Sequence, residues 1–238
     1  KMDESGADVH LLSSLDDIAW LLNIRGNDIL CCPLVLAYLI IYKDHVELFA
    51  DEEKFSDDMK REFAKNHVAL RPYTEIENAV GKLSGRKKML IDPERLSYAL
   101  YKLIPDETEM IEKENPEIIM KSVKNDIETE HIRRAHLKDA AAHTKFIYWL
   151  KENIGKTEIT ERSASARLEE FRKEQDGYLG PSFEPISAYY EHGAIVHYSA
   201  SKESDARLEK GHFLLTDTGG HYKDGSTDIT RTVALGEV

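Results

Sequence analysis

Two aspartates in the last part of this chain, Asp217 and Asp228, are joined by a stretch rich in turn-forming residues. An apolar run, 213–215, leads into the first aspartate, and a run rich in β-branched residues, 227–233, contains the second. Glycines, which accept the positive φ angles of tight turns, lie between the two runs at positions 219, 220 and 225. This pattern predicts two antiparallel strands that bring two carboxylates close together.

Strand alternation assigns a face to each side chain of this hairpin. Asp228 and Thr230 fall on one face of their strand, and Asp217 shares a face with Leu215 on the other strand. Both carboxylates then face one cavity, and Thr230 can orient Asp228 by a hydrogen bond. Like charges this close repel each other, and divalent cations compensate such repulsion. From the residues alone, an ordinary hairpin with surface carboxylates is the alternative, and Asp224 is expected to be only a turn residue.

The composition of the chain limits which binding partners and which cellular compartment we expect for it. The net charge of −12 and the isoelectric point near 5.3 argue against nucleic acid or an anionic membrane as the main partner. No apolar run approaches the ~20 residues of a membrane-spanning helix, and no signal peptide is recognisable. Adjacent cysteines form strained disulfides, so Cys31 and Cys32 are expected to be buried free thiols, with a metal or redox pair as the alternative. These features predict a cytoplasmic protein.

The first part of the chain alternates short strand and helix patterns, which is typical of an α/β domain with a mixed sheet. We place its end at residue 114, so the predicted domains are 1–114 and 115–238. The expected strands are 9–12, 33–42, 46–50, 68–70 and 88–91, and the expected helices are 17–22, 52–65, 75–83 (ending at Ser84 and Gly85) and 95–103.

The second part has longer helical patterns followed by strands. After a short helix at 116–124, residues 126–153 have a helical period with one apolar face. Thr160 can cap another helix, whose charged residues 161–170 are expected on its outer face. Strand patterns follow at 185–187 and 194–197, before the hairpin. The predicted fold class is α/β, or more broadly α+β.

The whole hairpin string, with Thr-Asp-Ile-Thr-Arg-Thr at 227–232, resembles the signature of the pita-bread metallopeptidases, the superfamily of methionine aminopeptidase, prolidase and creatinase. The resemblance implies that Asp217 binds one metal ion through both oxygens and that Asp228 bridges two. The segment 193–198 resembles a family strand, which implies that His197 binds substrate and stabilises the tetrahedral intermediate. His192 stands where the family usually has Asn. Without the resemblance, a lone histidine such as His197 is more often structural.

Other segments resemble the long, three-domain Xaa-Pro aminopeptidases within this superfamily. Residues 14–26 resemble their second domain, and segments in 123–141 and 182–187 resemble the start of their catalytic domain. The resemblance therefore implies a creatinase-N-terminal-like domain at 1–114, followed by the N-terminal half of a pita-bread domain at 115–238.

The family's metal site uses two Asp, one His and two Glu, and the last three would follow Val238. The chain is therefore expected to be a fragment that binds metal weakly and is inactive alone, with apolar surface that favours self-association. Three histidines in the predicted helix 126–153 are too scattered to replace the missing ligands: His131, His136 and His143.

For the parent protein, the resemblance implies a metalloaminopeptidase that removes an N-terminal residue preceding proline. The implied cofactors are two divalent metal ions, with Mn²⁺ expected and Zn²⁺ or Co²⁺ as alternatives. Proline-containing peptides are the implied partners, and a homodimer is the assembly the family often forms. The alternatives are a prolidase acting on dipeptides, a non-catalytic pita-bread binding protein, and a carbon–nitrogen hydrolase of the creatinase type.

Overall fold

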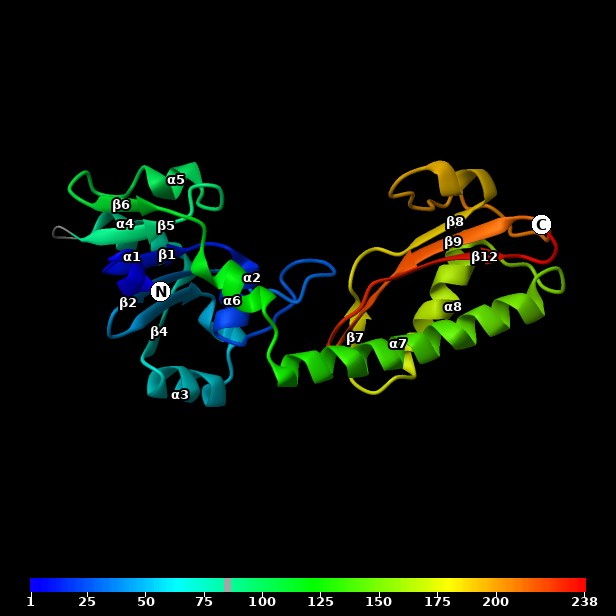
Figure 1. The fold of residues 1–238 in the computed structure, drawn as a ribbon, viewed down its shortest axis with the longest axis horizontal. Helices are drawn as coiled ribbons and strands as arrows, with labels where there is room; N and C mark the ends of the chain where they lie inside the picture. The colour runs from blue at the N-terminus through cyan, green and yellow to red at the C-terminus, as the bar shows by residue number, and fades with distance from the viewer. Residues whose placement is uncertain (84–86) are drawn as a thin grey trace. The chain divides into compact units, whose positions relative to one another are not determined.

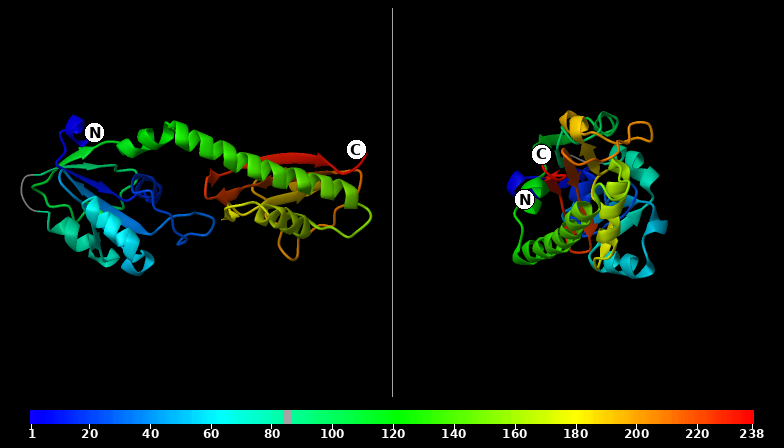
Figure 2. Two further views of the ribbon diagram at one scale, coloured as in Figure 1. Left: turned by 90° about the horizontal axis from the view of Figure 1, so that it is seen from below. Right: turned by 90° about the vertical axis from the view of Figure 1, so that its right-hand side faces the viewer.

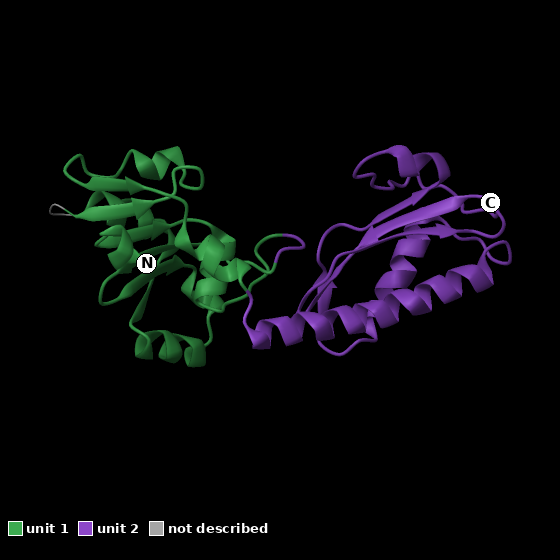
Figure 3. Ribbon diagram, viewed as in Figure 1, with its two compact units in different colours: residues 1–29, 33–123 green, residues 30–32, 124–238 purple. Residues whose placement is uncertain are grey.

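The computed structural model (Figures 1 and 2) describes residues 1–83 and 87–238. Its contacts divide the chain into two compact units, coloured separately in Figure 3. Unit 1 comprises residues 1–29 and 33–123, and unit 2 comprises residues 30–32 and 124–238. The domain boundary after residue 114 stays a prediction of the sequence. The predicted helix end at Ser84 and Gly85 lies outside the described residues.

In the described part of unit 1, six strands form one sheet in the order β4-β3-β2-β1-β5-β6. β1 pairs with β2, and β2 with β3, in the antiparallel sense, whereas the other three pairings are parallel. The mixed sheet that the sequence predicts is therefore confirmed. The strands are β1 (Val9–Leu12), β2 (Ala37–Tyr42), β3 (Val46–Ala50), β4 (Val68–Arg71), β5 (Lys88–Ile91) and β6 (Glu109–Glu112).

The helices of unit 1 cover both faces of this sheet. Buried side chains of α4 and α5 join one core cluster with β1 and β5, and side chains of α2 and α3 join a second cluster with β2 and β3. The predicted helix 52–65 is interrupted, because the Ser56 hydroxyl accepts the Met59 amide as an N-cap and starts a new helix. The helices are α1 (Met2–Ser5), α2 (Leu15–Leu21), η1 (Glu52–Lys54), α3 (Asp57–Lys65), η2 (Tyr73–Glu75), α4 (Ile76–Gly81), α5 (Tyr98–Tyr101) and α6 (Pro116–Ser122).

Two capped helices open unit 2. α7 (Asp126–Asn153) begins with a capping box between Asn125 and Glu128, and α8 (Glu161–Lys173) begins with one between Thr160 and Ser163. Each box satisfies amide groups that have no partner within the helix, which fixes where the helix starts. The predicted bounds of α7 and the predicted Thr160 cap are confirmed.

The strands of unit 2 form two small sheets, in the orders β12-β9-β8 and β11-β10-β7. The paired-aspartate hairpin is confirmed, with β9 and β12 antiparallel over six residue pairs. α7 and α8 pack on one face of the β12-β9-β8 sheet around a core that includes Phe146, Leu168 and Leu214 (Figure 1). The strands are β7 (Tyr178–Pro181), β8 (Ile186–Tyr189), β9 (Phe213–Thr218), β10 (Gly220–Tyr222), β11 (Gly225–Ser226) and β12 (Ile229–Ala234).

Two local predictions are corrected. Residues 194–197 do not form a strand: η3 (Tyr190–Ala194) and a turn replace it, with Tyr190 and His197 at positive φ. A strand needs a neighbouring strand for its backbone groups, and Ile195 and Val196 are instead exposed. Cys31 and Cys32 are free as predicted, but Cys31 is half-buried and Cys32 is exposed. Among the described residues, no helix combines the length and apolar character needed to cross a bilayer.

Candidate metal centre

The hairpin register brings the two aspartates to one place. Asp217 pairs with Thr230 in the ladder, and Thr218 pairs with Ile229. Asp228 lies two residues before Thr230, so alternation puts Asp217, Thr230 and Asp228 on the same face. Both aspartates line a cavity of about 480 Å³, and His197 lines the same cavity. The structure therefore brings together all three site residues that the sequence singles out.

A glycine permits this close approach. A Cβ atom at Gly219 would collide with the backbone carbonyl of Thr227 and with the Ser182 hydroxyl. The chain after Asp217 can thus pass directly against the chain before Asp228. The glycines of this stretch do not adopt the positive φ angles that the sequence suggests, and Gly219 is required by space instead.

The two carboxylates fit a cation chemically. Asp217 Oδ1 is buried and has no hydrogen-bond partner among the described residues, which is unusual for a polar atom inside a protein. Burial, and then the neighbouring charge of Asp217, raise the pKa of Asp228. Carboxylate oxygens are the ligands that hard divalent cations prefer. Within residues 1–83 and 87–238, no group of three or more His, Cys, Asp and Glu side chains is arranged to hold a metal, so this pair is an incomplete ligand set.

Asp224 and the three threonines near the aspartates in sequence differ in where they lie and in what they bond to. Asp224 lies in the turn, as predicted, and pairs with Lys138, which lowers the pKa of its carboxyl; it does not line the cavity that contains the aspartate pair. The predicted hydrogen bond from Thr230 to Asp228 is not found in the described residues. Thr218 and Thr227, adjacent in sequence to the two aspartates, are instead buried and hydrogen-bonded behind the hairpin.

His197 lies on a loop that is held by its neighbour. The imidazole is exposed, whereas Tyr198 is buried and its hydroxyl donates to Glu161 over 2.9 Å. The same carboxylate lies 2.8 Å from His192 Nδ1. The loop that carries His197 is therefore anchored on both sides to one side chain at the start of α8.

Glu161 is a buried residue that sequence reasoning missed. We expected it on the outer face of its helix, but it is fully buried and also accepts the backbone amides of Tyr189 and Ala206 over 2.7 and 3.1 Å. A buried carboxylate is stable only when such donors surround it. The only signal in the sequence was its place directly after the Thr160 cap, which does not reveal partners elsewhere in the chain.

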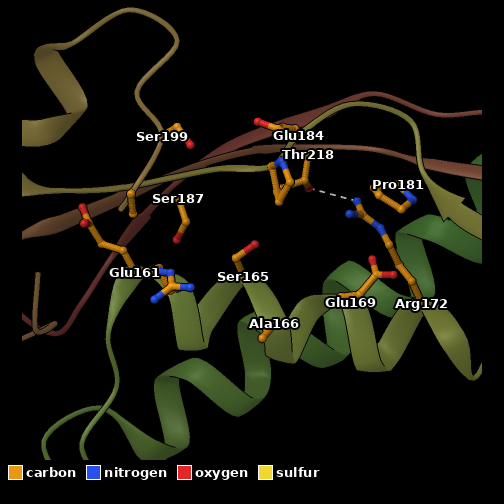
Figure 4. A pocket seen from close by; sticks show the side chains of 13 residues that line it. Glu161, Ser165, Ala166, Glu169, Arg172, Pro181, Glu184, Ser187, Ser199 and Thr218 are labelled. Atoms are coloured by element: carbon orange, nitrogen blue, oxygen red, sulfur yellow. Dashed lines mark hydrogen bonds between the residues drawn. The ribbon is translucent and has the colours of Figure 1, made fainter. Parts of the chain in front are cut away.

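A second cavity, of about 470 Å³, lies between α8 and the segment joining β7 to β8 (Figure 4). Glu161, Arg172 and Thr218 contribute to its wall, and Figure 4 shows Arg172 bonded to Thr218. Glu184 and Ser199 line both cavities, so the space behind the hairpin adjoins the space in front of it.

The histidines of α7 do not join the aspartate pair. His136 is exposed and bonds to the Ile132 carbonyl, and neither it nor His131 lines the cavity. His143 is buried, and burial, followed by the charge of Arg172, lowers its pKa to about 4. Among the described residues, these histidines belong to no group of three or more potential metal-ligating side chains.

Comparisons with known proteins agree with this architecture. The family described as Creatinase/Prolidase N-terminal domain matches residues 1–128, and metallopeptidase family M24 matches residues 130–238. The chain belongs to the creatinase/prolidase family. It joins a creatinase N-terminal domain to part of an M24 domain, so the family and the fold class predicted from the sequence are both confirmed.

Similar proteins include Xaa-Pro aminopeptidase 1 of Dictyostelium discoideum, which is 37% identical over all of this chain and 38% of its own length. The aminopeptidase ApepP of Drosophila melanogaster is 35% identical, with 39% of its length matched. An X-prolyl aminopeptidase from Caenorhabditis elegans, described as cytosolic with a di-nuclear active site, is 31% identical with a TM-score of 0.93, over 98% of this chain and 39% of that one. The chain thus spans about two fifths of these relatives.

Proposed function

We propose that this chain is part of a metal-dependent Xaa-Pro aminopeptidase that removes the N-terminal residue from peptides with proline in second position. The observation that carries the proposal is the convergence of Asp217, Asp228 and His197 on one cavity, with a buried Asp217 oxygen that lacks a partner. Similarity to Xaa-Pro aminopeptidases over the whole chain supports it.

In this proposal the two aspartates hold a pair of divalent cations, with Mn²⁺ the expected metal. When bound, such cations supply Lewis acidity and lower the pKa of a nearby water to around neutrality. Asp217 and Asp228 would be the carboxylates of this chain that hold the cations. The C. elegans relative, with its di-nuclear active site, supports a two-metal arrangement.

His197 would act on the substrate. Its exposed imidazole, on the wall of the same cavity as the aspartates, can donate a hydrogen bond to the carbonyl oxygen of the residue before proline. That bond strengthens as charge develops on the oxygen. Tyr198 and Glu161 would keep the loop in place while substrate binds. Proline lacks an amide hydrogen and restricts the backbone, so the bond before it needs a dedicated site.

The remaining ligands, one His and two Glu by resemblance, are proposed to lie outside these 238 residues. Divalent cations of this kind take about six ligands each. The 238-residue chain by itself is therefore proposed to be inactive. A cytoplasmic location is proposed because the C. elegans relative is described as cytosolic.

The test uses the full-length protein containing this chain, reconstituted with Mn²⁺. We expect cleavage of Xaa-Pro-Xaa tripeptides, loss of bound metal and of activity in Asp228→Ala, and loss of kcat with retained metal in His197→Ala. Activity on Xaa-Pro dipeptides but not tripeptides would establish the prolidase alternative. A metal-free, inactive full-length protein that still binds peptides would establish the non-catalytic one, and hydrolysis of a small guanidino acid the creatinase-type one.

A further inference from the structure

Behind the hairpin lies a buried ion pair that the proposed chemistry does not use. Asp139 of α7 and Arg172 of α8 are 0% and 2% exposed. The guanidinium donates to both carboxylate oxygens, with Nε 2.7 Å from Oδ1 and an Nη 3.2 Å from Oδ2. This two-bond geometry fixes the orientation of both side chains.

The pair reaches both strands of the hairpin. The same Nη of Arg172 donates to the Thr218 hydroxyl over 2.9 Å, as Figure 4 shows. The Thr227 hydroxyl donates to Asp139 and accepts the Gly220 amide over 2.9 Å. The network therefore connects two helices to the end of β9 and to Thr227, which lies two residues before β12.

These two threonines are the chain neighbours of the two aspartates. Thr218 follows Asp217, and Thr227 precedes Asp228. Because successive side chains of a strand point to opposite faces, each threonine points toward the helices while its neighbouring aspartate points toward the cavity. Whatever fixes Thr218 and Thr227 also fixes the spacing of the two carboxylates.

A buried ion pair is a costly way to fill a core. Removing two charges from water is unfavourable, and apolar residues of similar size often stabilise a protein at least as well. What such a pair supplies is defined geometry. Among the described residues, the other hydrogen bonds of this pair go to Thr218 and Thr227, the residues beside the two aspartates, apart from a longer contact of 3.3 Å from the Tyr222 hydroxyl to Asp139.

We propose that Asp139 and Arg172 are positioning residues that set the separation of the Asp217 and Asp228 carboxylates, through the hydroxyls of Thr218 and Thr227, before any metal binds. This inference rests on the proposed function, since it assumes that the two aspartates hold divalent cations. Removing hydrogen-bond partners behind metal ligands typically lowers metal affinity 10–100-fold.

The experiment measures Mn²⁺ affinity by titration calorimetry in the full-length protein, with the unfolding temperature of each metal-free variant recorded in parallel. Thr218→Val and Thr227→Val remove one hydroxyl each at nearly constant volume. Thr216→Val is the matched control, because Thr216 is equally buried on the same strand as Thr218, and its hydroxyl bonds, among the described residues, to the Arg231 carbonyl instead. Thr218→Ser and Thr227→Ser keep the hydroxyl and test for rescue.

We expect the two valine variants at 218 and 227 to lose about tenfold or more in affinity, the serine variants to regain it, and Thr216→Val to stay within about threefold of wild type. Thr218→Val and Thr227→Val should lower the unfolding temperature more than Thr216→Val, because their hydroxyls bond to buried charged groups. Wild-type affinity in Thr218→Val and Thr227→Val, or an equal loss in Thr216→Val, would overturn the inference alone. Absence of Mn²⁺ binding in the wild-type protein would overturn the proposed function as well.

Discussion

Glu161 offers a sharp test of how unit 2 holds the loop that carries His197. Its carboxylate is fully buried and receives four donors: Oε1 faces the Tyr189 amide and His192 Nδ1, and Oε2 faces the Tyr198 hydroxyl and the Ala206 amide. The substitution Glu161→Gln preserves shape and volume while replacing one of these two oxygens by an NH₂ group.

The cost follows from which partners can adapt. A hydroxyl and a neutral imidazole nitrogen can each accept as well as donate, so Tyr198 or His192 can turn to meet the new NH₂. A backbone amide can only donate. Whichever way the glutamine lies, either the Tyr189 or the Ala206 amide faces another donor and loses its partner. One unsatisfied buried donor costs about 1–3 kcal/mol, and we expect Glu161→Gln to lower the free energy of unfolding by that amount.

Urea unfolding followed by tryptophan fluorescence measures this change. The chain has two tryptophans, Trp20 and Trp149, and Trp149 packs beside the core of unit 2. A Trp20→Phe background therefore restricts the signal to that unit. Glu170→Gln is the control, because Glu170 lies on the same helix but is exposed and, among the described residues, pairs with Arg167 at the surface. Loss of such a pair changes stability by about 1 kcal/mol or less. Equal midpoints for the two variants would refute the account of Glu161.

Three further results are expected. Gly219→Ala should destabilise the protein by about 1–3 kcal/mol in urea unfolding, because its Cβ meets the Thr227 carbonyl. Gly225→Ala is the control, because its Cβ would make an ordinary contact of 3.7 Å and should hardly change the free energy of unfolding. Equal effects of the two substitutions would contradict the close-approach argument. Burial lowers the pKa of His143 from 6.5 to about 4, so the unfolded chain binds a proton at this residue more readily than the folded chain does. The free energy of unfolding should therefore fall as pH is lowered from about 6.5 toward 4. His143→Leu should flatten this dependence in unfolding curves across that range, and an unchanged slope would contradict the role given to His143. The 238-residue chain alone should bind Mn²⁺ no tighter than the micromolar range in calorimetry, and submicromolar binding abolished by Asp228→Ala would show that the ligand set is more complete than proposed.

In unit 2, sequence patterns correctly predict the helix and the hairpin whose structure depends on residues close together in the chain. The period of the apolar residues and the Asn125 cap determine α7, and alternation along 213–218 and 229–234 determines which side chains of the hairpin share a face. The same reasoning fails at 194–197, where an apolar run has strand character but no strand lies beside it. The apolar pattern of a segment shows which of its side chains could be buried, but it does not show whether another strand or helix lies beside the segment to bury them.

The charged residues behind the hairpin show the other limit. Asp139, Glu161 and Arg172 lie on helices where charge ordinarily marks the solvent face, yet all three are buried. Their partners come from distant parts of the chain, such as the Thr218 and Thr227 hydroxyls. No spacing rule links residues so far apart, so the aspartate pair could be predicted from the sequence while the structure that supports it could not.

The unpartnered oxygen of Asp217 also affects the stability of the folded state. Two carboxylates that repel each other, one with a buried oxygen that has no hydrogen-bond partner among the described residues, destabilise the folded state in the absence of a cation. A neutral substitution such as Asp217→Asn is therefore expected to make the metal-free protein more stable while removing the proposed metal site, as in the usual trade-off between stability and function. In the complete protein, a cation that binds only the folded state would raise apparent stability by mass action, by about 2.7 kcal/mol at a free concentration one hundred times its Kd. The supply of metal in the cell would then control how much of the protein stays folded, in addition to how much of it is active.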